Sequence, residues 1–367
     1  MTSDHASTVG PRRRPASTDV ARLAGVSQKT VSRVMNGEPH VRPDVITRVL
    51  HAAEQLGYRR NGAARALNSG RTHRIGVISL GTGLYGPASL LVATERAARR
   101  HGYGVSVAHT AENEPGGIVS AVEALIDQGL DGLVLSEPID EGPITISIDI
   151  PVLTLGRYPG LGARQLIHTQ DISERAGYLA TRFLLGLGHT EIRHLAGPSR
   201  WWSARDREAG WRRALLDANE QPVEPVAGDW LPRSGYEAGR RLARDPSMTA
   251  VFAANDDMAI GLMRALRDAG RRIPDDVSVI SIDDVPAAAF CSPSLSTVVQ
   301  SFDAVVDDGM TRLINAIENP GAPLAVRSDD ELPIIEREST APPPTAHRRL
   351  RTGQRSRPSP DLRTPVA

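Results

Sequence analysis

The sequence predicts an all-α module at the amino terminus, followed by an α/β core of two doubly wound lobes. Within residues 17–58 the apolar residues recur at helical spacing, and glycines interrupt the pattern. From Arg74 onward, short β-branched runs alternate with helical segments, and this series occurs twice. Such alternation is typical of parallel sheets covered by helices on both faces, and two series imply two lobes with a cleft between them.

The first two helices of the module, which we place at residues 17–60, are short and close together. Thr18 is expected to cap a helix over Asp19–Ala24, and Gly25 begins the turn. Ser27 is expected to cap a second helix over Gln28–Met35, so almost no chain separates the two.

A third helix should begin near Pro43 and end at Gly57. Its apolar residues share one face: Val45, Ile46, Val49, Leu50, Ala53 and Leu56. The apolar residues of the second helix are expected to pack against the first: Val31, Val34 and Met35 against Val20 and Leu23.

The polar residues of the second helix project together from its other side: Gln28, Lys29, Ser32 and Arg33. A helix-turn-helix lays its second helix in the major groove of DNA, with the N-terminal residues against base edges. Arginine or lysine can bond guanine and glutamine can bond adenine, each contact being worth about 1–3 kcal/mol of discrimination. Thr30 can bond a phosphate from the helix start. The alternative is a helical hairpin with a solvated polar face.

The net charge of zero conceals an uneven distribution, which favours the DNA-binding interpretation. Residues 1–75 carry 13 Arg and Lys against 5 Asp and Glu, and residues 341–367 carry 6 against 1, so the middle is acidic. A basic N-terminal module on an acidic body indicates that this end binds a polyanion. For the C-terminal end, a merely solvated basic tail is an equal alternative.

The composition excludes several classes of protein. No stretch approaches the roughly 20 apolar residues that cross a bilayer, and no apolar segment follows the arginines at 12–14 as in a secretion signal. Cys291 is the single cysteine, so no disulfide framework or cysteine metal cluster is expected. We therefore expect a cytoplasmic, nucleoid-associated protein with no membrane partner, no cofactor and no metal.

The two ends and the linker differ from the rest. Residues 1–16 lack an apolar pattern and residues 341–367 hold six prolines and six arginines, so both are expected to be disordered. A linker over residues 61–73 precedes the core, which we place at 74–340. Its sequence NGAARALN is shorter than the roughly 12–15 residues that an isolated helix needs in water, so it should be helical only with a partner.

Several segments carry a resemblance to a known family. DVARLAGVSQKTVSRVMNG, followed by VRPDVITRVLHAAEQLGYRRNGAARAL, resembles the DNA-binding headpiece of the LacI/GalR family of transcriptional regulators. The similarity continues through SARDREAGW, GDW, AANDDMAIG and ISIDDVPAA. It implies a headpiece, a hinge helix and a sensor core like that of periplasmic sugar-binding proteins.

The resemblance also implies roles for individual residues. Gln28 and Lys29 fall where the family reads base identity, and Arg33 falls at a base-contacting arginine. Two hinge segments would pair over the minor groove, with a leucine wedging open a base step. The expected DNA-binding residues are Thr18, Ser27, Gln28, Lys29, Thr30, Ser32, Arg33, Asn36, Tyr58, Asn61, Ala64 and Leu67.

A sugar site is expected in the cleft. Asn255 and Asp283 end predicted strands at the edge where open α/β sheets bind ligands. A sugar needs an apolar surface, which Trp230 can supply, and planar polar groups, which Arg205 can supply with those two residues. The resemblance implies the same four contacts. Packing between lobes is the alternative for Trp230, and core packing is an equal alternative for a fifth candidate, Phe302.

Three positions of the first lobe depart from a relative's sugar site. Gly156 stands in place of an aspartate, Leu80 in place of a small polar residue, and Ser136 in place of an amide. A galactoside, another glycoside or a disaccharide therefore all remain open as the effector. Two adjacent tryptophans near the cleft rim, Trp201 and Trp202, are candidates for selecting a bulkier ligand.

One motif favours an enzyme. GTGLYG, Gly81 to Gly86, matches the G-x-G-x-x-G dinucleotide pattern, although Pro87 interrupts the helix start and Glu112 comes two residues too late to bind a ribose. An NAD-type oxidoreductase core fused to a helical module is therefore the alternative. Our main hypothesis is a repressor of sugar-utilisation genes that a sugar releases from its operator. Because the proline-rich tail cannot form a coiled coil, we expect a homodimer on a pseudo-palindromic double-stranded operator.

Overall fold

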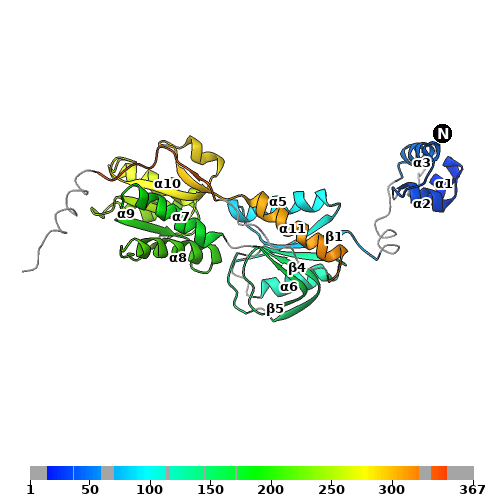
Figure 1. Cartoon of the computed structure of the whole chain (residues 1–367), viewed down its shortest axis with the longest axis horizontal. Coiled ribbons are helices and arrows are strands. Elements are labelled where there is room, and N and C mark those ends of the chain that lie inside the picture. Colours follow the sequence, from blue (N-terminus) through cyan, green and yellow to red (C-terminus); the bar gives the residue numbers. More distant parts are fainter. Residues whose placement is uncertain are drawn as a thin grey trace, which may run out of the picture. The chain divides into compact units, whose positions relative to one another are not determined.

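The structure is a computed structural model that describes residues 15–35, 37–58, 70–112, 116–136, 138–143, 145–169, 172–321 and 332–344. The chain divides into two compact units, residues 1–72 and 73–367 (Figure 1). We call them the headpiece and the core and describe each by itself.

In the described part of the headpiece there are three helices: α1 (Ser17–Ala24), α2 (Gln28–Met35) and α3 (Pro43–Gln55). Its small core combines residues from all three: Val20, Ala21, Ala24, Val31, Val34, Val49, Ala52 and Ala53. The second and third helices begin at the expected residues. Pro43 occupies the first turn of α3, where its missing N–H costs nothing.

Two details of the headpiece predictions are wrong. Thr18 does not cap α1, because the helix begins at Ser17 with Ala16 as its N-cap, and the carboxylate of Asp19 accepts a hydrogen bond from the Ala16 N–H at 2.9 Å. Leu23 and Leu50 do not join the core, since about half of each side chain is exposed. Alanines take the inward positions, because helices this close leave little room for larger side chains.

The N-terminal lobe of the core is built on a five-stranded parallel sheet in the order β2-β1-β3-β4-β5. Its strands are β1 (Arg74–Leu80), β2 (Gly104–Thr110), β3 (Gly132–Ser136), β4 (Ile146–Thr154) and β5 (Leu161–His168). Its helices are α5 (Tyr85–Arg100), α6 (Gly117–Ile126) and α11 (Phe302–Glu318).

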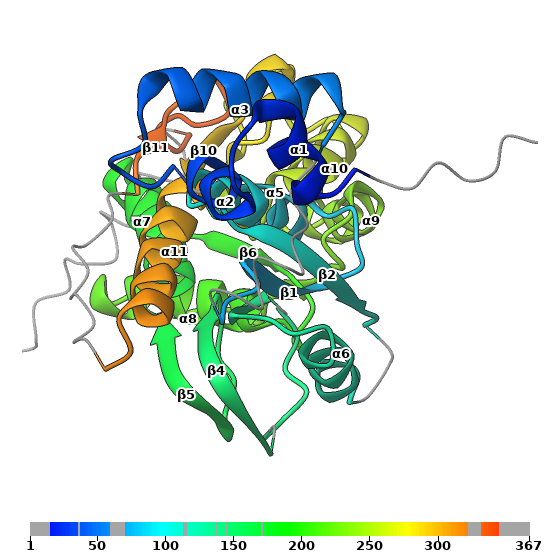
Figure 2. The same cartoon turned by 90° about the vertical axis from the view of Figure 1, so that its right-hand side faces the viewer.

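Successive residues of a strand point to opposite faces of this sheet, and both faces are covered. Val77 packs with α5 and α11, whereas Ile78 packs with α6. Figure 2 shows α6 and α11 on opposite sides of the strands. This double burial explains why the strands read as continuous apolar runs.

The C-terminal lobe is built on a six-stranded sheet in the order β11-β10-β9-β8-β6-β7, in which β11 alone is antiparallel to its neighbour. Its strands are β6 (Ile192–Ala196), β7 (Val226–Ala227), β8 (Ala250–Ala253), β9 (Ser278–Asp283), β10 (Ser296–Val299) and β11 (Ile334–Ile335). The helices α7 (Ser173–Gly186) and α8 (Trp202–Asp217) cover one face, and α9 (Pro232–Leu242) and α10 (Asp256–Asp268) cover the other.

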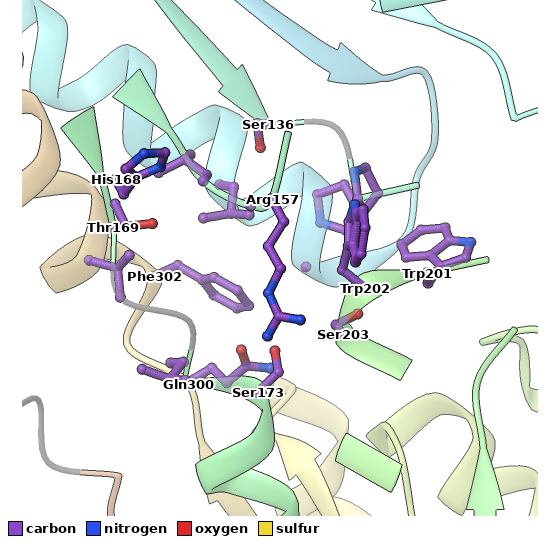
Figure 3. A pocket seen from close by; sticks show the side chains of 18 of the residues that line it. Ser136, Arg157, His168, Thr169, Ser173, Trp201, Trp202, Ser203, Gln300 and Phe302 are labelled. Atoms are coloured by element: carbon purple, nitrogen blue, oxygen red, sulfur yellow. The ribbon is translucent and has the colours of Figure 1, made fainter. Parts of the chain in front are cut away.

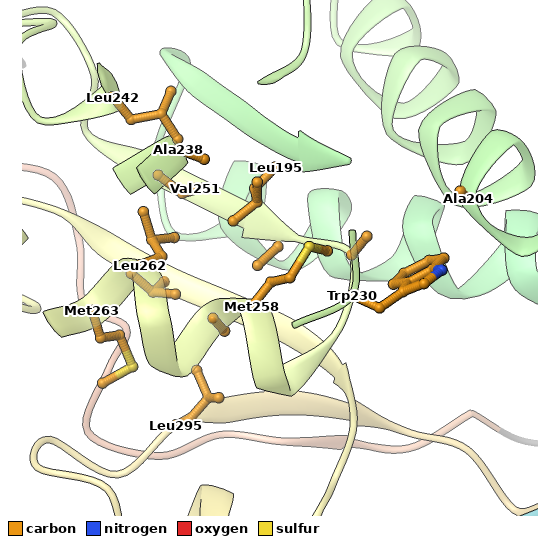
Figure 4. Packing of buried hydrophobic residues seen from close by; sticks show 14 of the residues in the cluster. Leu195, Ala204, Trp230, Ala238, Leu242, Val251, Met258, Leu262, Met263 and Leu295 are labelled. Atoms are coloured by element: carbon orange, nitrogen blue, oxygen red, sulfur yellow. The ribbon is translucent and has the colours of Figure 1, made fainter. Parts of the chain in front are cut away.

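Figure 4 shows the second of these faces, where Met258 and Leu262 of α10 lie under Leu195 and Val251 of the sheet. The predicted fold class, an all-α headpiece followed by two doubly wound α/β lobes, is confirmed. The strands and helices predicted from the sequence did not include β5, β7, β10, β11, α7, α9 or α11.

The chain passes repeatedly between the lobes. It leaves β5 for α7 near residue 172, and it returns after β10 to place α11 beside α5 in the N-terminal lobe (Figure 1). From residue 332 it is again part of the C-terminal lobe. There the carbonyl oxygen of Ala341 accepts hydrogen bonds from the Ser278 hydroxyl and bonds the His189 ring, so the start of the predicted disordered tail is packed on the lobe.

No helix among the described residues is long and apolar enough to cross a membrane.

Candidate DNA-binding face and effector cleft

The start of α2 presents the expected polar face. Gln28, Lys29 and Ser32 are exposed, and Thr30 and Arg33 are half-buried. The hydroxyl of Ser27 accepts a hydrogen bond from the Thr30 N–H at 3.1 Å, so Ser27 caps α2 as expected. Because two of the exposed residues begin the helix, they lie where a helix-turn-helix meets base edges.

Neighbouring groups orient the side chains of this face. The amide of Gln28 donates to the Ser17 hydroxyl at 2.9 Å, which ties the start of α2 to the start of α1. The guanidinium of Arg33 pairs with Glu38 at 3.2 Å and also donates to the Pro39 carbonyl. Both longer side chains are therefore held in defined directions rather than free in solvent.

The remaining predicted DNA-binding residues divide into two groups. Thr18 is exposed on α1, whereas Tyr58 is half-buried and packs against the headpiece core. Asn36, Asn61, Ala64 and Leu67 lie outside the described residues, as does most of the predicted hinge.

A cavity of about 490 Å³ lies between the two lobes of the core (Figure 3). The N-terminal lobe contributes mainly apolar groups: Pro87, Leu90, Leu155, Gly156, Tyr158 and Pro159, together with Ser136, Arg157 and His168. The C-terminal lobe and the segment that follows β10 contribute Trp201, Trp202, Ser203, Arg207 and Gln300. The volume is that of a site for a small organic ligand.

Of the five predicted effector residues, Phe302 lines this cavity. It begins α11, and its ring meets Tyr85 edge-on with 5.9 Å between ring centroids. Trp230, Asn255 and Asp283 are buried behind the wall that the C-terminal lobe forms, and none of them lines the cavity.

Asp283 acts on the cavity through two residues that line it. Its carboxylate lies 3.7 Å from the guanidinium of Arg207 and accepts a hydrogen bond from the Gln300 amide at 2.5 Å. Burial raises the pKa of Asp283, and the charge of Arg207 partly opposes this rise. Arg207 also donates to the Ala254 carbonyl at 2.5 Å, so its position is fixed from two sides.

The prediction named Arg205, but Arg207 is the arginine that reaches the cavity. Two residues along an α-helix are about 200° apart around its axis, so these two side chains leave α8 in nearly opposite directions. Arg205 pairs instead with Asp140 of the N-terminal lobe at 2.8 Å, and its guanidinium stacks 4.3 Å from the ring centroid of Trp202.

The close crossing of α7 and α8 sets where Arg207 stands. A Cβ atom on Gly177 would come within 2.2 Å of the Arg207 carbonyl oxygen, and one on Gly210 within 2.0 Å of the Glu174 carbonyl oxygen. Only glycine permits this approach, because any side chain would push the helices apart.

Trp230 and Asn255 support the site from behind. The Trp230 ring packs against Gly197 and meets Trp201 edge-on at 5.4 Å, and its backbone has a φ of 75°. The Asn255 amide donates to the Trp230 carbonyl at 3.0 Å, and its oxygen caps α10 by accepting from the Met258 N–H. This pairing holds Trp230 in an unfavourable backbone conformation.

The N-terminal lobe differs at the three positions noted in the sequence. Gly156 and Ser136 line the cavity, and Leu80 is buried in the hydrophobic core. The hydroxyl of Ser136 is buried without a hydrogen-bond partner among the described residues.

The lobes also touch at the rim of the cavity, which we call the mouth: residues 138–140 of the N-terminal lobe against residues 200–205 of the C-terminal lobe. Ile139 forms a β-bridge with Trp201, and the Asp140 N–H donates to the Arg200 carbonyl at 2.8 Å. A second ion pair crosses between the lobes from Arg157 to Asp206 at 3.1 Å.

The fold and these two sites define a class: a helix-turn-helix module joined to a two-lobed, periplasmic-binding-protein-like sensor core. Two family models match this chain and agree with that class. "Bacterial regulatory proteins, lacI family" matches residues 18–61, and "Periplasmic binding protein-like domain" matches residues 181–340.

The chain is 31% identical to the lactose operon repressor of Escherichia coli (strain K12) over 335 residues, which cover 89% of this chain and 91% of that repressor. It is 33% identical to the ribose operon repressor of the same strain, over 82% of this chain and 93% of that protein. The chain belongs to the lacI family of bacterial regulatory proteins and is a DNA-binding transcriptional repressor with an effector-binding core. Because the regulators of this family are not enzymes, the oxidoreductase alternative is rejected.

Two solved structures extend the comparison. The lac repressor dimer bound to operator and an anti-inducer matches with a TM-score of 0.74 and 29% identity, over 90% of this chain and all of that one. A complex of the transcriptional regulator CelR with cellobiose matches with a TM-score of 0.62 and 28% identity, over 89% of this chain and all of that one.

Proposed function

We propose that the chain represses sugar-utilisation genes as a homodimer and that a sugar in the cavity between the lobes releases it from its operator. One observation carries the proposal: Gln28 and Lys29 are exposed side by side at the start of the second helix of a helix-turn-helix. A dimer places two such helices on DNA, so the operator should be pseudo-palindromic.

The cavity supports a sugar as effector. Phe302 offers an aromatic face to the C–H surface of a pyranose, and the Arg207 and Gln300 side chains offer planar donors to its hydroxyls. The relatives point the same way, since one was crystallised with cellobiose and others repress lactose and ribose operons. Because both lobes line the cavity, a bound sugar changes the free energy of any rearrangement between them.

A solved relative supports the dimer, because the lac repressor that matches this chain was crystallised as a dimer bound to operator. Phe290, at the end of the short 3-10 helix Pro286–Phe290, is 88% exposed. Aromatic residues are enriched in protein interfaces, so Phe290 is a candidate contact for the second subunit. We propose that the core dimerises, acts in the cytoplasm and brings two hinge segments, residues 61–73, together on the operator.

The proposal is tested by selecting duplexes from a random library with the purified full-length protein. Replacing Gln28 and Lys29 together with alanine should change which duplexes are enriched and leave sugar affinity unchanged. Replacing Asp283 with asparagine should abolish the response to sugar and leave duplex selection unchanged. Enrichment of no sequence, or stabilisation of the core by NADH and by no sugar, would contradict the proposal.

A further inference from the structure

Among the aromatic side chains that line the cavity, Phe302 and Trp202 stand on either side of Arg157. Phe302 begins α11 and Trp202 begins α8, and both line the same space. Figure 3 shows Arg157 projecting between them. Because the guanidinium of Arg157 stands between the two rings, a single sugar ring cannot stack on both of them at once.

The Trp202 end has features of a binding subsite. The indole N–H of Trp202 is buried and has no hydrogen-bond partner among the described residues. An indole N–H can only donate, and burying a donor without an acceptor costs about 1–3 kcal/mol. The indole N–H groups of Trp211 and Trp230 are buried in the same way and do not line the cavity, so the ring of Trp202, and not its N–H, is the group offered to a ligand.

The side chains around Trp202 fix its position. The guanidinium of Arg205 stacks 4.3 Å from the ring centroid and is held by Asp140 of the opposite lobe. The guanidinium of Arg157 lies 5.9 Å from the same centroid and is held by Asp206. Two ion pairs of opposite direction thus cross the cleft beside one tryptophan, and the ring presents a prearranged surface rather than a mobile one.

The same arrangement places donors along the length of the cavity. The unpartnered Ser136 hydroxyl projects into it from the end of β3, and Arg157 presents its guanidinium between the two rings (Figure 3). A ligand of two linked rings has oxygens at both rings and at the linkage between them, so it can meet donors beside both aromatic side chains.

We propose that Trp202 forms a second subsite, which binds the outer ring of a two-ring effector, a disaccharide or an aryl glycoside, while the inner ring lies against Phe302. This inference rests on the proposed function, because it names the size class of the sugar that the cleft takes. Trp202 is then the residue that determines specificity for two rings over one.

The experiment measures binding of matched sugars to the full-length protein by calorimetry. The one-ring probes are methyl β-glucoside and methyl β-galactoside, and the two-ring probes are cellobiose, lactose and the 4-nitrophenyl glycosides of both sugars. The wild type should bind at least one two-ring probe about tenfold or more tightly than its one-ring counterpart. Trp202→Ala should remove that preference and leave one-ring affinity unchanged, and Trp202→Phe should keep most of it. The disaccharide and nitrophenyl arms show which kind of outer ring is accepted.

Leu216→Ala, an exposed change at the far end of the same helix, is the matched control and should alter nothing. Equal affinity of the wild type for one-ring and two-ring probes would overturn the inference and leave the proposed function standing. An equal loss for both kinds of probe in Trp202→Ala would also overturn it. If none of the six sugars binds or releases a selected duplex, the proposed function fails and this inference fails with it.

Discussion

The two walls of the cavity are built differently. The C-terminal lobe backs it with buried polar groups that bond one another, in which Asp283 holds Arg207 and Gln300 and Asn255 holds Trp230. The N-terminal lobe offers prolines, leucines and a glycine, with one unpartnered hydroxyl at Ser136. The difference indicates that one lobe supplies a fixed anchor for the ligand and that the other lobe, with the mouth, sets which ligand fits.

Breaking the anchor should have the largest effect. Arg207→Met leaves the buried carboxylate of Asp283 without its cation, and removing one partner of a buried pair costs about 3–5 kcal/mol. We expect the free energy of unfolding, measured in urea, to fall by that amount and sugar binding to be lost. The double variant Arg207→Met with Asp283→Leu is the control, and it should regain most of the stability but none of the binding. Full stability in the single variant would show that the network is not an anchor.

A buried histidine behind the same wall tests how rigid the C-terminal lobe is. His194 of β6 is stacked between Phe252 and Trp211 at 4.6 and 5.3 Å, and burial lowers its pKa to about 4. The neutral ring of His194 therefore contributes fully to the free energy of unfolding above pH 6.5, the ordinary histidine pKa. This contribution is lost as the pH falls from 6.5 toward 4.

Across that pH window, His194→Phe should gain up to about 3 kcal/mol relative to the wild type, because phenylalanine keeps the stacking and cannot be protonated. Chemical unfolding at pH 7, 6, 5 and 4.5 measures the difference. A difference between the two proteins that does not change with pH would mean that water reaches the ring and that the lobe opens easily.

The opposite wall should respond in the opposite way. Ser136→Ala removes a hydroxyl that bonds nothing in the described structure, so the free energy of unfolding should not fall. The free energy of sugar binding should become less favourable by about 0.5–1.5 kcal/mol, the net contribution of one hydrogen bond. Calorimetry and thermal melting on the same samples separate the two effects. A clear loss of stability would assign Ser136 to the fold rather than to the site.

The mouth should give the smallest effect. Asp140→Asn weakens a half-exposed ion pair with Arg205, and such pairs contribute about 0.2–1 kcal/mol. We expect an unchanged melting temperature within about 2 °C and a small change in sugar affinity that high salt removes. Glu237→Gln, which breaks a surface pair on α9 far from the cavity, is the matched control. An equal change in both variants would show that the mouth has no specific effect on sugar affinity.

The helix-turn-helix face could be predicted from the sequence more fully than the cleft. A helix of eight residues fixes which side chains share its polar face, so Gln28, Lys29 and Ser32 were found by spacing alone. Leu23 was misplaced, because spacing cannot say how deeply three short helices interpenetrate.

In the cleft, the ends of predicted strands located Asn255 and Asp283, but the direction of a side chain depends on tertiary packing. The sequence SARDREAG holds two arginines two residues apart, and the choice between Arg205 and Arg207 follows from the close crossing of α7 and α8 at Gly177 and Gly210. Gln300 comes directly after β10, and Asp283 is the last residue of β9, so the same signal was available for Gln300. His168 and Thr169 were missed because β5 was not predicted.

The central claim is that ligand in the cavity and DNA on the headpiece are coupled, and reciprocal titration tests it most directly. The affinity of the best-bound sugar is measured with and without a saturating selected duplex, and the affinity for the duplex is measured with and without the sugar. Thermodynamic linkage requires the sugar affinity and the duplex affinity to change by the same factor. For a repressor that its ligand releases, we expect each affinity to fall about 5-fold or more when the other ligand is bound. A sugar affinity that does not change when the duplex is bound would contradict the account.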